Sequence, residues 1–224
     1  MNHSIKISII TRTYNNHDFI RKCLGCTLNQ DFRDYEVILI NDGSTDATKL
    51  IIDSFKDLKL KVVHQNNSGM IPAAYEGLKR AKGEYIVFLD GDDECTENML
   101  TELYLAVNNY PGKAFSYCDY LERDLKNKAE KIVSTENIFN TLACGILWKR
   151  EVIEELGFWD KTLIFPEHDF MIRALKKYKG VRVNKPLYIY NRHDKSATAN
   201  KEMVEKGKQQ IFARHGIIKG FKEY

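Results

Sequence analysis

Residues Gly83–Cys95 read GEYIVFLDGDDEC, an apolar run that ends in four acidic residues within five positions, Asp90, Asp92, Asp93 and Glu94. The apolar part has the length and composition of a buried β-strand. Carboxylates crowded at the end of a buried strand repel one another and lose hydration. The stretch therefore predicts a central strand of a sheet and, beside the acidic end, a cationic group that compensates the charge.

The first ninety residues alternate between strand-like and helix-like patterns. Apolar runs that end in polar residues occupy residues 6–15, 35–44, 60–65 and 84–90. Helical spacing occupies residues 17–30, 46–58 and 70–83. Strands and helices in strict alternation are typical of a parallel sheet with helices on both faces. We therefore predict an α/β fold with a Rossmann-like, mostly parallel sheet.

Polar residues follow every one of these strands. They are Thr11, Thr13, Tyr14 and Asn15, then Asn41, Asp42 and Ser44, then Gln65, Asn66 and Asn67, and finally Asp90, Asp92 and Asp93. In such sheets the ligand lies beyond the carboxyl ends of the strands. Polar loops are common, but four that converge on one edge favour a site for a polar ligand.

The second half of the chain has a different rhythm. We expect a helix at 96–110, a strand at 114–124, mixed structure at 131–157, a helix at 165–180 that Gly180 ends, two short strands around Pro186, and a helix at 201–215. The sequence contains no repeat or low-complexity linker. We therefore expect one domain over 1–224, with halves at 1–94 and 95–200 and a basic C-terminal helix and tail at 201–224.

Composition limits the class of protein. The 224 residues are 43% hydrophobic and 29% charged, as in an ordinary globular protein. The N-terminus has no leader pattern and the apolar runs are strand-sized, so we expect a cytoplasmic protein. Five cysteines fit a reducing compartment. Cys23 and Cys26 form a CxxC without a second pair, and we expect them in the core or on a helix face.

The charge is distributed unevenly along the chain. The net charge is +3, but residues 176–224 hold 13 Lys and Arg against 4 Asp and Glu, so the tail carries +9 and the rest −6. A basic tail can bind nucleic acid, anionic lipid or a phosphorylated substrate. The alternative is a solvated face. No nucleic-acid-binding motif accompanies the charge, and we expect no nucleic-acid partner.

Three groups of residues could carry chemistry. The acidic cluster could hold Mn²⁺ or Mg²⁺ on substrate phosphates, or could be a turn that caps the helix near Glu97. In PEHDFMIRAL, Glu167 could accept a proton, while Asp169 and Arg173 form an i,i+4 pair; the alternative is helix capping. His193 could contact metal or phosphate, or could be an ordinary loop residue.

In combination and in order, these motifs resemble a family 2 glycosyltransferase of the GT-A fold over about residues 5–198. ISIITRTYN is similar to the opening strand of that family, YEVILINDGSTDAT to its second strand, and NNSGMIPAAYEGLKRAKGEYIVFLDGDD to the segment that leads to its DxD motif. CGILWKREVIEELGFWDKTLIFPEHDFMIRAL follows its acceptor-side pattern. The resemblance implies an acceptor-side half and an inverting, metal-dependent transfer from a nucleotide sugar, with a UDP-sugar favoured.

The resemblance also implies roles for single residues. Donor nucleotide contacts would come from Thr11, Thr13, Tyr14, Asp42, Asn67, Gly69 and Asp90, and metal contacts from Asp92, Asp93 and His193. Counting back from Arg173 places Glu167 at the usual catalytic aspartate, with Asp169 as the alternative base. The family often has arginine where this chain has Ala74, so His193 could supply the missing cationic contact.

Two other functions remain open at this point. A sugar-nucleotide pyrophosphorylase is disfavoured because TRTYNN lacks the glycine-rich loop that wraps a triphosphate. A degenerate domain that only binds saccharide or a partner is disfavoured by the intact acidic motifs. The acceptor would be a saccharide or lipid-linked saccharide. The basic tail would suit peripheral contact with the inner membrane surface, and Trp148, Phe158 and Trp159 would stack on sugars or belong to the core.

Overall fold

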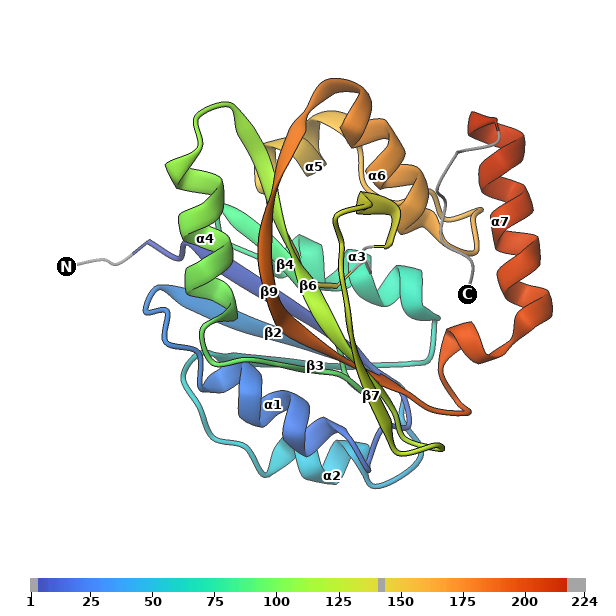
Figure 1. Cartoon of the computed structure of the whole chain (residues 1–224). Coiled ribbons are helices and arrows are strands. Elements are labelled where there is room, and N and C mark those ends of the chain that lie inside the picture. Colours follow the sequence, from blue (N-terminus) through green and yellow to red (C-terminus); the bar gives the residue numbers. More distant parts are fainter. Residues whose placement is uncertain (1–3, 141–143, 217–224) are drawn as a thin grey trace.

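The computed structural model describes residues 4–140 and 144–216 of the chain. In the N-terminal half, strands and helices alternate as the sequence predicts (Figure 1). They are β1 (Ile7–Thr13), α1 (Ile20–Leu28), β2 (Tyr35–Asp42), α2 (Thr48–Asp53), β3 (Leu60–Gln65), α3 (Met70–Arg80) and β4 (Tyr85–Asp90). Helix α2 is shorter than the predicted 46–58. The Asp57 carboxylate accepts a hydrogen bond from the Lys59 N–H, which favours a turn there over helix.

The second half adds shorter and more irregular elements. They are β5 (Glu94–Cys95), α4 (Met99–Asn109), β6 (Lys113–Asp124), β7 (Ala129–Val133), a 3₁₀ turn at Ile138–Asn140, β8 (Ile146–Lys149), α5 (Arg150–Leu156), α6 (Pro166–Lys177), β9 (Lys179–Arg192), a 3₁₀ turn at Ala197–Ala199 and α7 (Lys201–His215). The predicted C-terminal helix is therefore present. Residues 217–224 of the predicted basic tail lie outside the described residues.

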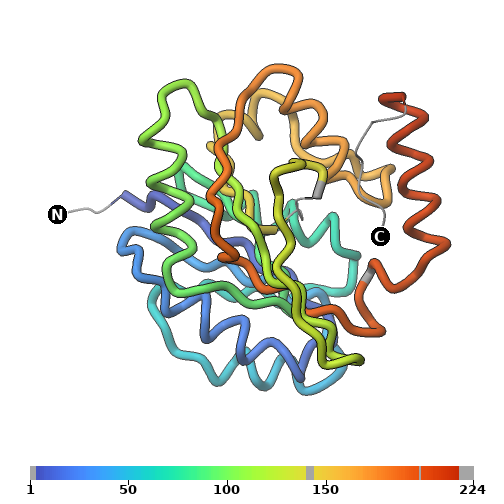
Figure 2. Tube along the Cα trace, viewed as in Figure 1, coloured from blue at the N-terminus to red at the C-terminus, as the bar shows by residue number. Residues whose placement is uncertain are grey.

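A nine-stranded sheet runs through both halves in the order β3-β2-β1-β4-β8-β6-β9-β5, with β7 paired to β6. Strands β1 to β4 are parallel to one another, as predicted. Strand β8 is antiparallel to both β4 and β6 and joins the halves. Strands β6 and β9 are distant in sequence but run side by side in parallel (Figure 2). The sheet is thus parallel in its first half and mixed in its second.

Helices bury both faces of the parallel half. Successive residues of β2 alternate between two apolar clusters: Val37 and Leu39 belong to the large core, whereas Ile38 and Ile40 pack with Ala73 of α3. This pattern explains why the strand reads as a continuous apolar run rather than as alternating apolar and polar residues. Cys23, Trp148 and Trp159 are buried in the large cluster. Cys26 and Phe158 are partly buried and pack against it.

Two expectations about the second half were wrong in detail. Gly180 does not end α6, because the helix ends at Lys177 and Tyr178 is already extended. Gly180 lies within β9, where a Cβ would overlap the Phe115 ring. Residues 179–192 form one strand rather than two. Its pairing with β6 passes from Val183 directly to Pro186 and continues beyond the proline. The two extra residues form a bulge, where a proline does not interrupt the pairing.

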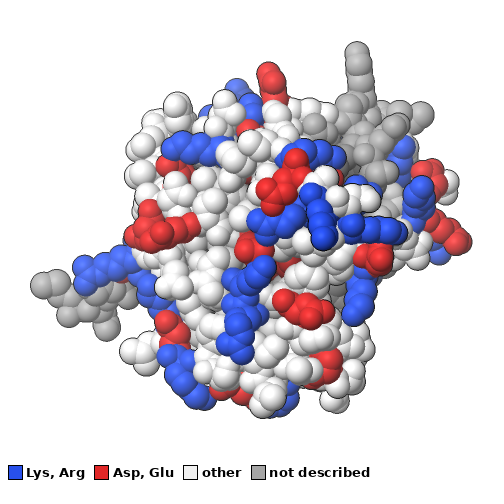
Figure 3. All heavy atoms as spheres, turned by 60° about the horizontal axis from the view of Figure 1, so that its bottom comes forward, with Lys and Arg blue, Asp and Glu red and all other residues white. Residues whose placement is uncertain are grey.

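Helix α7 lies beside α6 at one side of the molecule (Figure 1). No helix within the described ranges is both long and apolar enough to cross a membrane. On the face shown in Figure 3, Lys and Arg side chains lie next to Asp and Glu side chains and do not form one continuous basic surface.

Candidate functional site

A cavity of about 500 Å³ opens at the carboxyl ends of β1, β2 and β4. Its volume lies within the usual range for small-molecule sites. Nine of the residues selected from the sequence line it, namely Thr13, Tyr14, Asp42, Asn67, Gly69, Asp90, Asp92, Asp93 and Glu167. Residues from both halves of the chain therefore line one cavity, and those of the first half lie there as the convergence of the strand ends predicts.

Three other selected residues lie outside this lining. Thr11 is fully buried in β1, and its hydroxyl has no hydrogen-bond partner among the residues that the structure describes. Asp169 is buried in α6. His193 follows β9 and stacks on the Phe19 ring, with 4.7 Å between ring centroids, while its Nε2 points to Asp92.

At one end of the cavity, Asp42 fastens a loop to the end of β2. Its Oδ1 accepts hydrogen bonds from the Gln65 side chain (2.7 Å) and the Ser68 N–H (3.0 Å), and its Oδ2 accepts one from the Gly69 N–H (2.8 Å). Gly69 has φ +96°, a conformation that favours glycine, and it precedes α3 directly. Neutral donors thus hold the Asn67 to Gly69 loop at the cavity wall.

Asp90 is paired with an arginine that the sequence analysis did not select. The Arg12 Nε donates to Asp90 Oδ1 at 3.0 Å, and its Nη2 contacts the same oxygen. Arg12 is only 6% exposed, and its guanidinium lies 5.1 Å from the Trp159 ring centroid. Part of the expected compensating cation is therefore a protein side chain. The available signal in the sequence was a charged residue near the end of a strand whose residues are all buried.

Asp93 is engaged by β9 through both carboxylate oxygens. The Asn191 N–H donates to its Oδ1 at 2.8 Å, and the Tyr188 hydroxyl donates to its Oδ2. Burial and the neighbouring Asp92 raise the pKa of Asp93 well above its usual range. These contacts fix the acidic segment to β9 and leave Asp92 as the neighbouring carboxylate with fewer protein contacts.

Asp92 and His193 form the part of the site that could hold a metal ion. The Asp92 Oδ2 lies 3.0 Å from the His193 Nε2, and the Asp92 side chain is 22% exposed. Across residues 4–140 and 144–216, no three His, Cys, Asp or Glu side chains converge as a metal site. Mg²⁺ and Mn²⁺ commonly take one or two carboxylates and fill their remaining positions with substrate phosphates and water. The donor set fits an ion of that kind.

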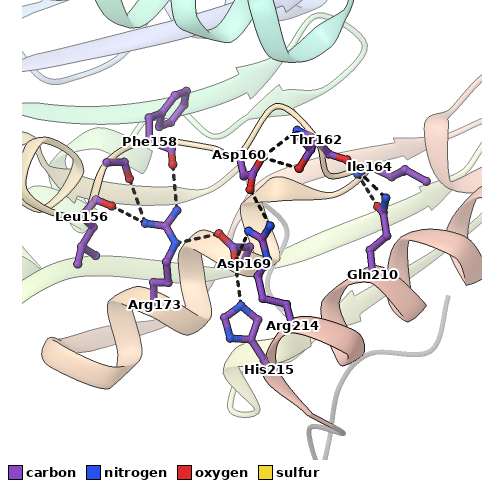
Figure 4. Close-up of polar contacts among 11 residues, drawn as sticks. Leu156, Phe158, Asp160, Thr162, Ile164, Asp169, Arg173, Gln210, Arg214 and His215 are labelled. Atoms are coloured by element: carbon purple, nitrogen blue, oxygen red, sulfur yellow. Dashed lines mark hydrogen bonds and ion pairs between the residues drawn. The ribbon is translucent and has the colours of Figure 1, made fainter.

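Glu167 and Asp169 occupy the first turn of α6 but have different surroundings. The Glu167 carboxylate lines the cavity, with His168 Nδ1 at 3.5 Å. The Asp169 carboxylate is 1% exposed and contacts Arg173 of α6 and Arg214 and His215 of α7 (Figure 4). The candidate base Glu167 and its alternative Asp169 are therefore on opposite sides of the α6 backbone, one in the cavity and one in an ion-pair cluster.

Further cavity residues come from β9 and the loop after it. They are Tyr188, Tyr190, Lys195, Ser196 and Thr198. Lys195 and Ser196 follow His193 in the polar stretch NRHDKSAT, which was the only sequence signal for them. Sequence analysis missed them because only the tertiary fold brings the end of β9 to the carboxyl end of β4.

Comparisons with known proteins give the family of the chain and several of its relatives. Residues 8–157 match the family model described as Glycosyl transferase family 2. The chain is 37% identical to the glycosyltransferase GlyG of Streptococcus pneumoniae over 219 residues, covering 85% of this chain and 72% of GlyG. It is 29% identical to GlyA of the same organism, covering 83% of this chain and 30% of GlyA, and 29% identical to EpsJ of Bacillus subtilis, covering 62% of EpsJ. The chain thus spans less than two thirds of the last two relatives.

Solved structures share the fold at low sequence identity. TarS of S. aureus in complex with UDP-GlcNAc aligns with a TM-score of 0.76 at 21% identity, covering 93% of this chain and 66% of that one. The mannosyltransferase PcManGT of Pyrobaculum calidifontis, in complex with GDP-Man and Mn²⁺, aligns with a TM-score of 0.74 at 19% identity, covering 95% and 64%.

Proposed function

Because the chain belongs to glycosyl transferase family 2 and has a GT-A type of fold, we propose that it transfers a sugar from a nucleoside-diphosphate sugar to a hydroxyl group. The acceptor is a saccharide or lipid-linked saccharide. The observation that carries the proposal is one cavity that contains the Asp42 loop, Asp92 and Glu167. These three groups suit the nucleotide, the diphosphate and the attacking hydroxyl of a single displacement.

The donor is a UDP-sugar in this proposal. Support comes from TarS, a structural neighbour whose crystal structures contain UDP-GlcNAc or UDP. Asp42, Asn67 and Gly69 form the wall that the nucleotide would contact, and Tyr14 at 47% exposure can stack on the base. PcManGT, with GDP-Man, makes GDP the natural competitor in a test.

A divalent cation would be held by Asp92 and His193 together with diphosphate oxygens. When bound, such an ion, Mn²⁺ or Mg²⁺, would supply positive charge beside the departing diphosphate. Lys195 is exposed at the same wall and adds a positive charge from the protein itself. In this proposal Asp90, held by Arg12, contacts the ribose of the donor nucleotide. Asp93 keeps the acidic segment in place.

Glu167 is the base in this mechanism. The acceptor hydroxyl oxygen forms a bond to the anomeric carbon, the bond from that carbon to the diphosphate oxygen breaks, and Glu167 takes the hydroxyl proton. The anomeric configuration inverts in this one step. Asp169 does not serve as the base, because its two oxygens already contact Arg173, Arg214 and His215.

The test measures thermal unfolding of the purified chain with UDP, GDP or dTDP, each with Mn²⁺ and with excess chelator. A ligand that binds only the folded state stabilises it by about 2.7 kcal/mol at a hundred times its Kd. We expect UDP to raise the Tm only when the metal is present. Asp92→Ala should remove this shift and abolish sugar transfer, whereas Asp124→Ala, at the end of β6 and outside the cavity lining, should retain both.

Two results would contradict the proposal. Metal-dependent transfer that survives in Asp92→Ala would show that another group holds the diphosphate. A wild-type chain that no nucleotide stabilises would instead favour a degenerate domain that binds saccharide or a partner without catalysis. Full activity on a free saccharide, with no gain from lipid vesicles, would remove the membrane-bound acceptor from the proposal.

A further inference from the structure

Helix α7 packs on residues 160–169, the segment that enters α6. Gly207 lies against the ring of Phe165, where a Cβ would overlap the ring atoms. Four residues later, Ile211 is 1% exposed and clusters with Leu163. The helix therefore presents a small residue and an apolar residue, one turn apart, to this segment rather than to solvent.

A polar side chain of α7 also fixes the backbone of the segment. Gln210 Oε1 accepts a hydrogen bond from the Ile164 N–H at 2.9 Å, and Gln210 Nε2 donates to the Thr162 carbonyl at 3.4 Å (Figure 4). One amide thus pairs with a donor and an acceptor of the same loop. Such pairing specifies the position of the loop more closely than apolar contact alone.

The contact ends in a charged cluster around Asp169. Its Oδ2 accepts a hydrogen bond from Arg173 Nε (2.8 Å), and its Oδ1 contacts Arg214 Nη1 (3.3 Å) and His215 Nε2 (2.8 Å). Arg214 also pairs with Asp160 at 2.7 Å, so it joins both ends of the segment (Figure 4). The C-terminus of α7 meets the N-terminus of α6 here, and the helix dipoles favour the observed placement of cations and carboxylate.

The opposite side of the same segment forms part of the cavity. Phe165, Glu167 and His168 line it, and Glu167 shares the first turn of α6 with Asp169. Residues in one helical turn move together, so a shift of the Asp169 carboxylate also shifts the Glu167 carboxylate. Helix α7 therefore supports, from behind, the wall that presents Glu167 to the cavity.

We propose that Arg214 and His215 are positioning residues, which hold Glu167 in its reactive place by binding Asp169 across the α6–α7 contact. This inference rests on the proposed function and assigns α7 a part in it. Arg214 has the larger part, because it alone of the pair contacts both Asp160 and Asp169.

The test compares three variants of the full chain: Arg214→Met, Arg214→Lys and the control Lys206→Met. Lys206 is exposed on α7, so its change removes the same charge from the same helix without touching the cluster. Two quantities are measured. One is hydrogen exchange of the backbone amides at 165–170. The other is the steady-state release of nucleoside diphosphate from whichever of UDP-GlcNAc, UDP-glucose, UDP-galactose and GDP-mannose turns over fastest in the wild type.

We expect Arg214→Met to lower kcat by about 10- to 100-fold with little change in the donor KM, as misplacement of a reacting group does. Exchange at 165–170 should become faster, while amides near Asp42 keep their wild-type rates. Arg214→Lys should restore part of both properties, and Lys206→Met should match the wild type.

Unchanged exchange at 165–170 in a folded Arg214→Met protein would overturn the inference. So would an equal loss of kcat in Lys206→Met, or a rise in donor KM that accounts for the whole effect. If the wild type binds and turns over no nucleotide sugar, the proposed function fails. The exchange measurement then still decides whether the α7 contact holds the Glu167 turn.

Discussion

Asp42 and Asp169 are both buried carboxylates, 4% and 1% exposed, but the protein holds them in different ways. Asp42 accepts hydrogen bonds from neutral donors at residues 65–69, which follow it after one helix and one strand. Asp169 is bound by two arginines and a histidine, and Arg214 and His215 come from a helix more than forty residues later. The first arrangement is built within the parallel sheet, and the second connects separate parts of the chain.

The two ends of the cavity are therefore held in place by different kinds of interaction. Neutral hydrogen bonds leave the charge of Asp42 for a ligand to use, so that wall can recognise a polar ring. The charge of Asp169 is compensated by the protein, since hydrogen bonds from His215 and Arg173 lower its pKa even though burial acts to raise it. We therefore expect Asp42 to act in binding and the Asp169 cluster to act in placing Glu167.

The largest effect should come from a substitution of Glu167 that impairs the chemical step but not nucleotide binding. Glu167→Gln keeps the shape of the side chain but replaces one acceptor oxygen with an NH₂ donor and removes the base, so kcat should fall by about 10²- to 10⁴-fold. The Kd for UDP with Mn²⁺ should stay at the wild-type value, because the nucleotide end is untouched. Steady-state kinetics and calorimetry measure the two quantities. A matching loss in Asp169→Asn, with its α6–α7 contact intact, would transfer the role of base to Asp169.

A smaller effect is expected at the other carboxylate. Asp42→Ala leaves the N–H groups of Ser68 and Gly69 without their acceptor, and each lost hydrogen bond costs about 0.5–1.5 kcal/mol. The loop should loosen, so UDP binding should weaken by more than the kcat of the saturated enzyme falls. Titration calorimetry and saturation kinetics give the two numbers. Unaltered UDP affinity in this variant would place the nucleotide elsewhere.

The smallest effect concerns pH at the α7 contact. Hydrogen bonds from the Thr162 hydroxyl and N–H, together with Arg214, lower the pKa of Asp160 to about 2. The folded pKa lies below the value of about 3.9 for an unperturbed aspartate. Its contribution to stability is therefore complete above about pH 4 and is lost as the pH falls toward 2. Urea unfolding of wild type and Asp160→Asn should differ at pH 7, and the difference should shrink below pH 4 and vanish only below about pH 2. Equal free energies of unfolding for wild type and Asp160→Asn at pH 7 would contradict this prediction.

The parallel half of the fold could be predicted from sequence because its contacts are local. Each strand and the helix after it are neighbours in the chain, so apolar runs and the polar residues that end them determine both the sheet and its functional edge. Seven of the nine cavity residues chosen from the sequence follow from this rule, whereas Gly69 and Glu167 were chosen through the family resemblance. Arg12 was missed because its partner, Asp90, belongs to a different strand.

The second half was predicted less well for the opposite reason. Gly180 suggested the end of a helix, and Pro186 a break in a strand, when each was considered alone. The Phe115 ring and the ladder to β6 explain both residues, but these contacts join segments more than sixty residues apart. Local pattern carries no information about such pairs.

The sequence by itself determined the alternating α/β half, the polar edge of its sheet and the acidic segment at Asp90 to Glu94. It did so because strand and helix periodicity and the position of strand ends are local properties. Only the tertiary structure decided which of Glu167 and Asp169 enters the cavity and which is sealed by α7. Both carboxylates lie in the same helical turn, and what distinguishes them is the packing of a helix that comes much later in the chain.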